Sequence, residues 1–249
     1  MGPLTLHTYG LFIALGVLAG THLMIYRAKQ RGMPAEAAQD AYYSLTFHAL
    51  VAGFLGARLL YVITFWDQFA DQWPALFKVW EGGLVFYGGL IGGSAGFVLW
   101  KKRHPDIPWF QALDIAAPAM AAGHALGRLG CFFAGCCYGR PTDVPWAVMF
   151  THADALAPLG IPLHPAQIYE FLFLCALAAY LSIRSARSHA DGAVFIDYLT
   201  LYPIGRFAVE FYRADPPMMA GLSSGQIVSI VMVIVSIVIR MKLSKARDA

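Results

Sequence analysis

Residues 123–139 of this 249-residue chain read GHALGRLGCFFAGCCYG. The stretch follows an apolar run typical of a membrane helix, yet it contains Arg128 with no acid near it in the sequence. An arginine at membrane depth is energetically costly and usually marks a functional site. The five glycines of the stretch indicate close backbone approach or a bend. We therefore treat residues 123–139 as the centre to which the rest of the chain brings other polar groups.

The composition predicts an all-α polytopic membrane protein that forms a single transmembrane domain over residues 1–249. Hydrophobic residues make up 58% of the chain and charged residues 13%, whereas soluble domains carry about 25% charged residues. The net charge of +3 says nothing about nucleic acid, because the basic residues lie between apolar runs, and we expect no nucleic-acid partner. The N-terminus lacks the basic region and cleavage site of a signal peptide, so we expect the first apolar run to be retained.

Seven apolar segments approach the length needed to cross about 30 Å of hydrocarbon. They are residues 8–26, 43–66, 83–100, 110–127, 166–183, 193–213 and 224–241. Twelve basic residues follow the first, third and fifth segments or lie in the C-terminal tail. The positive-inside rule then predicts an external N-terminus, a cytoplasmic C-terminus and an external region 128–165. Five prolines within residues 138–165 predict a small, ordered external loop or cap there.

The four cysteines match neither a disulfide framework nor a zinc motif. Cys131, Cys136 and Cys137 are clustered and Cys175 stands apart, which is too few for a framework. The CxxxxCC spacing lacks the second CxxC or HxxxH half of a zinc site. The sequence therefore predicts no metal and no cofactor.

Several polar residues interrupt the apolar segments. Arg58 lies inside the second segment. Its side chain either snorkels to the membrane interface, pairs with an acid, or belongs to a functional site. Tyr87 in the third segment is flanked by glycine pairs that indicate close backbone approach. Asp114 is expected to cap or hydrogen-bond within the bundle. His124 shares a helix face with Arg128 and is either a bundle histidine or a member of the site.

Two acidic residues lie in later segments. Glu170 enters the membrane shortly after Pro165, which suits the first turn of a helix. It is either a counter-ion for an arginine or part of the site. Arg206 and Glu210 are four residues apart and share a helix face. They form either a self-contained ion pair or part of a site.

The motifs together resemble the prolipoprotein diacylglyceryl transferase family over nearly the whole chain. The resemblance is carried by WEGGLVFYGGLIGG at residues 80–93, GRLG at 127–130 followed by YGRPTD at 138–143, HPAQIYE at 164–170 and RFAVEFYR at 206–213. Members of that family are multi-pass proteins of the bacterial cytoplasmic membrane with seven spans and an externally facing site. They transfer a diacylglyceryl group from phosphatidylglycerol to the lipobox cysteine of a lipoprotein precursor and release glycerol phosphate.

The resemblance implies a set of catalytic and substrate-binding residues. Arg128 and Arg206 are expected to clamp the lipid phosphate, because arginine pairs with phosphate in a bidentate manner. Glu210 is expected to orient Arg206, Tyr87 to bind the headgroup or relay the acceptor proton, and Tyr202 to face the same way as Arg206. The remaining predicted substrate-binding residues are Arg58, Gly88, Gly89, Gly139, His164, Tyr169 and Tyr9.

The chain departs from the family signature at two positions, Cys131 and Cys136, where the family has Asn and Glu. Three interpretations of the cysteines stay open: inert replacements that alter the substrate, a redox-labile disulfide from Cys131 to Cys136 or Cys137, or a nucleophilic thiol. The acceptor is therefore a lipoprotein precursor or another thiol. Two further functions stay open, a membrane thiol-redox protein and a non-catalytic lipid-binding or transport protein.

Overall fold

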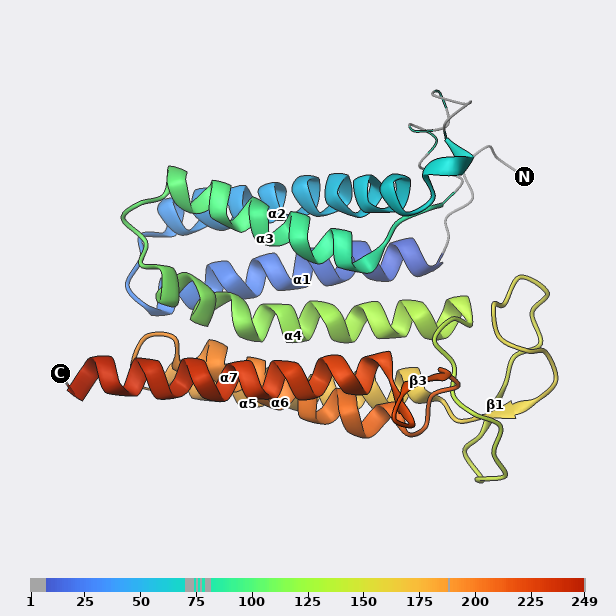
Figure 1. Ribbon diagram of the computed structural model, residues 1–249. Coiled ribbons are helices and arrows are strands. Elements are labelled where there is room, and N and C mark those ends of the chain that lie inside the picture. Colours follow the sequence, from blue (N-terminus) through green and yellow to red (C-terminus); the bar gives the residue numbers. More distant parts are fainter. Residues whose placement is uncertain are drawn as a thin grey trace. The chain divides into compact units, whose positions relative to one another are not determined.

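The computed structural model describes residues 8–69, 74, 76, 78, 82–187 and 189–248, which are mainly helical (Figure 1). Each of the seven α-helices coincides with one predicted apolar segment, which confirms the helical class. They are α1 (Thr8–Gln30), α2 (Ala35–Thr64), α3 (Phe86–Arg103), α4 (Trp109–Ala134), α5 (Ala166–Ala186), α6 (Ala193–Glu210) and α7 (Ser224–Asp248). A 3₁₀ turn, η1 (Trp66–Gln68), follows α2.

Four of the described helices are long and apolar enough to cross a membrane: α1, α2, α5 and the Ser224–Leu243 part of α7. Many large apolar side chains on these helices are exposed, among them Leu18, Leu59, Leu172 and Ile234. Exposed apolar side chains in such numbers suit helices that face lipid. The chain therefore has the character of a helical membrane protein, while seven spans and their orientation stay predictions.

The chain forms two compact units, and the single domain predicted from the sequence stays a prediction. Unit 1 comprises Met1–Gln30 and Phe110–Ala249, and unit 2 comprises Arg31–Trp109. In unit 2, α2 and α3 pack along a stripe of glycines on α3. A side chain at Gly88, Gly92 or Gly96 would overlap a carbonyl oxygen of α2. Small residues at this spacing let two helix backbones approach closely.

Unit 1 has a core shared by α4, α5 and α6. It includes the buried side chains of Ala117, Ala121, Leu174, Leu181 and Val194. Asp114 of α4 is fully buried and accepts hydrogen bonds from the backbone N–H groups of Gly192 and Phe195, both at 2.8 Å. It thereby satisfies donors at the start of α6. This confirms the prediction that Asp114 caps or hydrogen-bonds within the bundle.

Short strands gather at the end of unit 1 where α4 ends (Figure 1). Strand β1 (Val148–Met149) pairs with β2 (Pro162–Leu163), and β3 (Pro217–Met219) pairs with β4 (Leu222–Ser223). Gly139 forms a bridge to Arg213, which ties the loop after α4 to the loop after α6. The segment 138–165 is therefore ordered, as its prolines predict, and it carries the short strands β1 and β2.

Candidate active site

Glu170 of α5 is a buried acid at the centre of a charged cluster in unit 1. Its side chain is 1% exposed, and its Oε1 lies 2.9 Å from Nη2 of Arg128 on α4. Its Oε2 lies 3.7 Å from Nη1 of Arg206 on α6. A carboxylate buried this deeply requires cationic partners. Glu170 therefore holds the guanidinium groups of two other helices close to one point.

Arg206 and Glu210 form the ion pair that their spacing predicts, with Nη1 of Arg206 2.6 Å from Oε2 of Glu210. The pair is not self-contained. The Ser223 hydroxyl at the end of β4 donates a 2.7 Å hydrogen bond to Oε1 of Glu210. Gly225 in the first turn of α7 leaves room for this carboxylate, because a Cβ there would lie 2.7 Å from Oε1. The Glu210 carboxylate is thus held between α6, the end of β4 and the start of α7, and in this position it orients Arg206.

His124 and Tyr202 lie beside the same acid. Nε2 of His124 lies 3.7 Å from Oε1 of Glu170, and its ring centroid lies 5.3 Å from that of Tyr202. Tyr202 in turn stacks on Tyr198, at 5.7 Å between centroids. His124 therefore joins the cluster on the same helix face as Arg128, as the four-residue spacing predicts.

Arg213 extends the cluster beyond the end of α6. Its Nε lies 3.5 Å from Oε2 of Glu210, and Nε and Nη2 also donate to the two carboxylate oxygens of Asp215 at 3.0 and 3.2 Å. Its Nη1 donates to the carbonyl oxygen of Cys137 at 3.2 Å. Arg213 therefore connects the buried glutamate to the cysteine loop.

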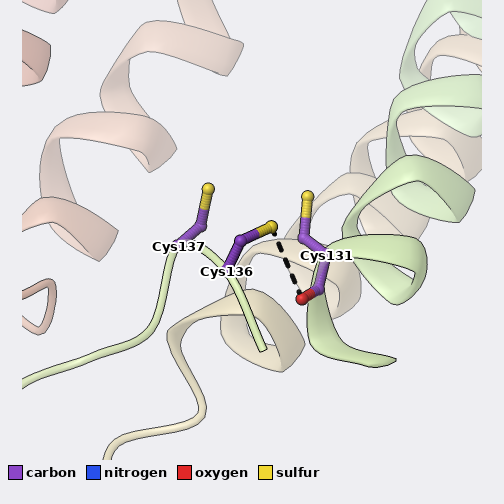
Figure 2. A group of neighbouring side chains, drawn as sticks. All are labelled: Cys131, Cys136 and Cys137. Atoms are coloured by element: carbon purple, nitrogen blue, oxygen red, sulfur yellow. Dashed lines mark hydrogen bonds between the residues drawn. The ribbon is translucent and has the colours of Figure 1, made fainter. Parts of the chain in front are cut away.

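The three clustered cysteines converge at the end of α4 (Figure 2). The sulfur atoms of Cys131, Cys136 and Cys137 all lie within 4.8 Å of one another, and each residue is half-buried. Gln167 near the start of α5 donates a 2.7 Å hydrogen bond to the carbonyl oxygen of Cys136. This bond fixes the cysteine loop against the helix that carries Glu170.

Gly139, His164 and Tyr169 hold the loops together next to these cysteines. A side chain at Gly139 would overlap the carbonyl oxygen of His164, so only glycine fits there. His164 Nδ1 and the Tyr169 hydroxyl are hydrogen-bonded at 3.1 Å, and both rings contact Tyr212 edge to face. These three predicted substrate-binding residues have structural partners, and lipid contact at each of them stays a prediction.

The predicted residues of unit 2 are also engaged in local structure. The Arg58 guanidinium donates to the carbonyl oxygens of Leu76, Gly82 and Gly83 at 3.0, 2.8 and 3.1 Å. Tyr87 lies in the first turn of α3 and is 50% exposed. Gly88 and Gly89 follow it, and Gly88 belongs to the glycine stripe against α2. The substrate roles of these four residues stay predictions.

Tyr9, the remaining predicted residue, lies near the start of α1 in unit 1. A Cβ on Gly130 of α4 would lie 3.2 Å from its ring, so the tyrosine packs beside the cysteine-bearing turn of α4. Tyr9 is 44% exposed. Its contact with a substrate stays a prediction.

The charged cluster is suited to bind a phosphate group. Three arginines, Arg128, Arg206 and Arg213, meet two buried glutamates, so the buried part of the cluster carries 3 − 2 = +1, and the partly exposed Asp215 at its edge brings the total to 3 − 3 = 0. Nε of Arg128 is buried and has no hydrogen-bond partner among the described residues. Unused guanidinium donors and preorganised positive charge are what a phosphodiester requires.

Comparison with known proteins agrees with this chemistry. The profile of the family described as prolipoprotein diacylglyceryl transferase matches residues 1–242. The chain belongs to this family. It is 39% identical over 236 residues to the phosphatidylglycerol–prolipoprotein diacylglyceryl transferase of Clostridium tetani, covering 94% of this chain and 92% of the relative. It is 36% identical to enzyme 2 of that name from Clostridium perfringens, covering 93% and 88%, and 35% identical to the enzyme of Synechococcus elongatus, covering 93% and 81%.

Membership in the prolipoprotein diacylglyceryl transferase family makes the chain a transferase of the membrane. Of the five predicted catalytic residues, the structure brings Arg128, Arg206, Glu210 and Tyr202 to the cluster in unit 1, while Tyr87 belongs to unit 2. The predicted catalytic set omits Glu170, although the expectation that Glu170 is a counter-ion for an arginine is confirmed by its contacts with Arg128 and Arg206. It also omits Ser223, which nothing in the local sequence distinguishes from an ordinary serine.

Proposed function

We propose that this chain transfers the diacylglyceryl group of phosphatidylglycerol to the cysteine thiol of a lipoprotein precursor and releases glycerol phosphate. The proposal follows the activity named for its relatives. The observation that carries it is the pair of arginines, Arg128 and Arg206, held on the buried carboxylate of Glu170 at 2.9 and 3.7 Å.

The reaction requires charge stabilisation at the phosphate. The acceptor sulfur forms a bond to the glyceryl carbon as the bond from that carbon to the phosphate oxygen breaks. The thiol proton is released to water, and glycerol phosphate departs with the bonding electrons and one more negative charge than the lipid phosphodiester carried. Arg128 and Arg206 stabilise this developing charge, because fixed donors in a water-poor site need no reorganisation during the reaction.

The two glutamates act as positioning residues. Glu170 holds Arg128 and Arg206 together against their mutual repulsion. Glu210 lies one helical turn after Arg206 on α6 and fixes the orientation of its guanidinium group. Tyr202 lies one turn before Arg206 on α6, and we assign its hydroxyl to the lipid headgroup. Positioning of this kind lowers the barrier because the reacting groups are already oriented when the lipid binds.

We also propose that all seven helices span the bacterial cytoplasmic membrane, with the N-terminus and the cysteine loop outside. The basic residues that follow α1, α3 and α5 and those of the tail support this orientation. Cysteine-specific labelling of intact cells checks it. A membrane-impermeant maleimide should label a single cysteine placed in the segment 150–160 and should not label one placed in 242–249 of a cysteine-free variant.

Complementation tests the activity itself. In a strain depleted of its own diacylglyceryl transferase, the wild-type chain should restore growth and lipoprotein processing, and Arg128→Ala should not. Arg240→Ala is the matched control, because this arginine is 57% exposed and pairs with Asp197 elsewhere on unit 1. Failure of a well-expressed wild type would refute a lipoprotein precursor as the acceptor. Rescue by Arg128→Ala would refute the phosphate clamp.

Further variants and measurements separate this proposal from its two alternatives. If wild-type protein does not complement, the double variant Cys131→Asn and Cys136→Glu tests whether those positions alone changed the acceptor. A thiol-redox protein predicts activity that depends on a disulfide and survives Arg128→Ala. A lipid-binding protein predicts phosphatidylglycerol binding without any product at a thiol.

A further inference from the structure

The cysteine cluster of unit 1 has the arrangement of a metal site, although the sequence spacing matches no zinc motif. Among the described residues, Cys131, Cys136 and Cys137 form the group of potential ligands whose sulfur atoms all lie within 4.8 Å of one another. Their side chains project from the backbone toward one side of the loop (Figure 2). Three convergent sulfur atoms are more than a disulfide requires.

The end of α4 brings Cys136 back over Cys131. The N–H of Cys136 donates to the carbonyl oxygen of Cys131 at 3.1 Å, and the N–H of Gly135 donates to that of Phe132 at 3.1 Å. Gly135 has φ +67°. This nested pair of bonds around a left-handed glycine is a Schellman motif, which reverses the chain at a helix end. A Schellman motif brings together two residues that are five apart in the sequence, as Cys131 and Cys136 are.

A second left-handed residue adds the third thiol. Cys137 has φ 59°, a conformation that residues with a Cβ seldom adopt. Consecutive side chains of an extended chain point to opposite sides, whereas this turn leaves Cys136 and Cys137 on the same side (Figure 2). The backbone thus accepts a disfavoured conformation at the position where it makes the three sulfur atoms converge.

The separations suit metal coordination by three thiolates. A metal–sulfur distance of about 2.3 Å in a trigonal arrangement requires sulfur atoms about 4.0 Å apart. The sulfur atoms lie within 4.8 Å of one another, so small rotations of the side chains reach that geometry. Soft thiolate ligands select Zn²⁺ and Cu⁺ among the common ions. Each of the three cysteines is only half-buried, so the cluster is not sealed inside the bundle.

Two arginines offset the negative charge of such a site. Arg128 lies one helical turn before Cys131 and interacts electrostatically with Cys131 and Cys137, and Arg213 interacts with Cys137. Three thiolates around Zn²⁺ or Cu⁺ carry a net charge of 2 − 3 = −1 or 1 − 3 = −2. The two guanidinium groups beside the cluster offset part of this negative charge.

We propose that Cys131, Cys136 and Cys137 bind one thiophilic metal ion, Zn²⁺ or Cu⁺, through their three sulfur atoms. Binding releases the protons of those thiols that are still protonated and leaves a fourth position open, as in zinc sites with three protein ligands. The proposal goes beyond the transferase activity and does not depend on it, because its test reads metal binding alone.

Spectroscopic titration of the purified full-length protein tests the proposal. The protein is prepared without a histidine tag, reduced, transferred to buffer free of reductant under nitrogen, and titrated with Co²⁺ as a probe for Zn²⁺. One equivalent should produce a thiolate-to-cobalt charge-transfer band, which Zn²⁺ then removes. Competition with a Cu⁺ chelator forms the second arm and distinguishes the two ions. Each of Cys131→Ser, Cys136→Ser and Cys137→Ser should weaken binding about tenfold or more.

Cys175→Ser is the matched control, because this exposed cysteine of α5 lies outside the cluster, and it should bind as the wild type does. A second measurement needs no variant: Zn²⁺ or Cu⁺ should protect the three clustered thiols of the wild type from alkylation, read by mass spectrometry, and leave Cys175 unprotected. The proposal is overturned if the reduced wild type binds neither ion stoichiometrically. It is also overturned if binding survives loss of any clustered cysteine, or if two of them resist reduction as a disulfide.

Discussion

Replacing Arg128 and Glu170 by methionine, singly and together, separates the stabilising role of their ion pair from its catalytic role. The two charged groups are 2.9 Å apart, and Glu170 is 1% exposed. At an effective dielectric constant of about 20, unit charges at that distance attract by about 6 kcal/mol. Desolvation of both groups offsets much of this attraction. Removing one partner of a buried pair costs about 3–5 kcal/mol where the other charge is left without a partner. Glu170→Met leaves Arg128 in that state, whereas Arg128→Met leaves Glu170 with Arg206 at 3.7 Å.

We expect Glu170→Met to lower the free energy of unfolding by about 3–5 kcal/mol, and Arg128→Met to lower it by less, because Glu170 keeps Arg206. The double variant should be more stable than either single variant, since no charge of this pair is then left alone and Arg206 keeps Glu210 at 2.6 Å. The coupling free energy should be on the order of 3 kcal/mol. Transferase activity, by contrast, should be lost in all three variants, because each lacks Arg128 or the carboxylate that positions both arginines.

Unfolding in mixed micelles, followed by circular dichroism as the fraction of denaturing detergent rises, measures the stabilities. Headgroup release from phosphatidylglycerol measures the activity of the same samples. Stability changes that add within about 0.5 kcal/mol would refute the coupling of Arg128 to Glu170. An active double variant would refute the proposal that this arginine stabilises the reacting phosphate.

Two further predictions concern the surroundings of the cluster. Gly225→Ala places a Cβ 2.7 Å from Oε1 of Glu210, so it should displace this carboxylate and lower activity about tenfold. Gly10→Ala is the control, because a Cβ there meets nothing within 4 Å, and it should leave activity unchanged. Equal activities of the two variants in the assay of headgroup release would contradict this prediction. Hydrogen bonds with the Cys131 and Cys136 thiols lower the pKa of Cys137. Its thiolate should therefore persist as the pH falls below the usual cysteine pKa range of about 8–9. Cys131→Ala removes a hydrogen bond to that thiolate and should move the midpoint of Cys137 alkylation by iodoacetamide to higher pH in metal-free protein; an unchanged or lower midpoint would show that the bond does not set this pKa.

The helices and one ion pair could be predicted from the sequence because their causes are local. Apolar runs of spanning length located all seven helices, although some ends differ by seven or eight residues, as at Ala35, where α2 begins. The four-residue spacing of Arg206 and Glu210 placed both on one face. The burial of Asp114 beneath the start of α6 was foreseen only as a general capping role, because its partners, such as Gly192, are distant in the sequence.

Other features of the site depend on tertiary packing, and sequence spacing does not reveal them. Glu170 is the hub of the cluster because α4 and α6 both pack on α5, a fact that no single helix contains. Ser223 reaches Glu210 through the turn before α7. The convergence of the cysteines depends on the left-handed backbone at Gly135 and Cys137. A spacing rule for zinc motifs does not include such a turn, so it predicted no metal ligands here.

Release of labelled glycerol phosphate from headgroup-labelled phosphatidylglycerol tests the central proposal most directly. Purified wild-type protein in lipid nanodiscs should release the label in the presence of a lipobox peptide that contains cysteine, and not with the same peptide carrying serine. Arg128→Ala should reduce the rate by about 100-fold or more, while Arg240→Ala should leave it unchanged. A folded wild-type protein that binds the lipid and releases no label, or an Arg128→Ala variant as fast as the wild type, would contradict the assignment.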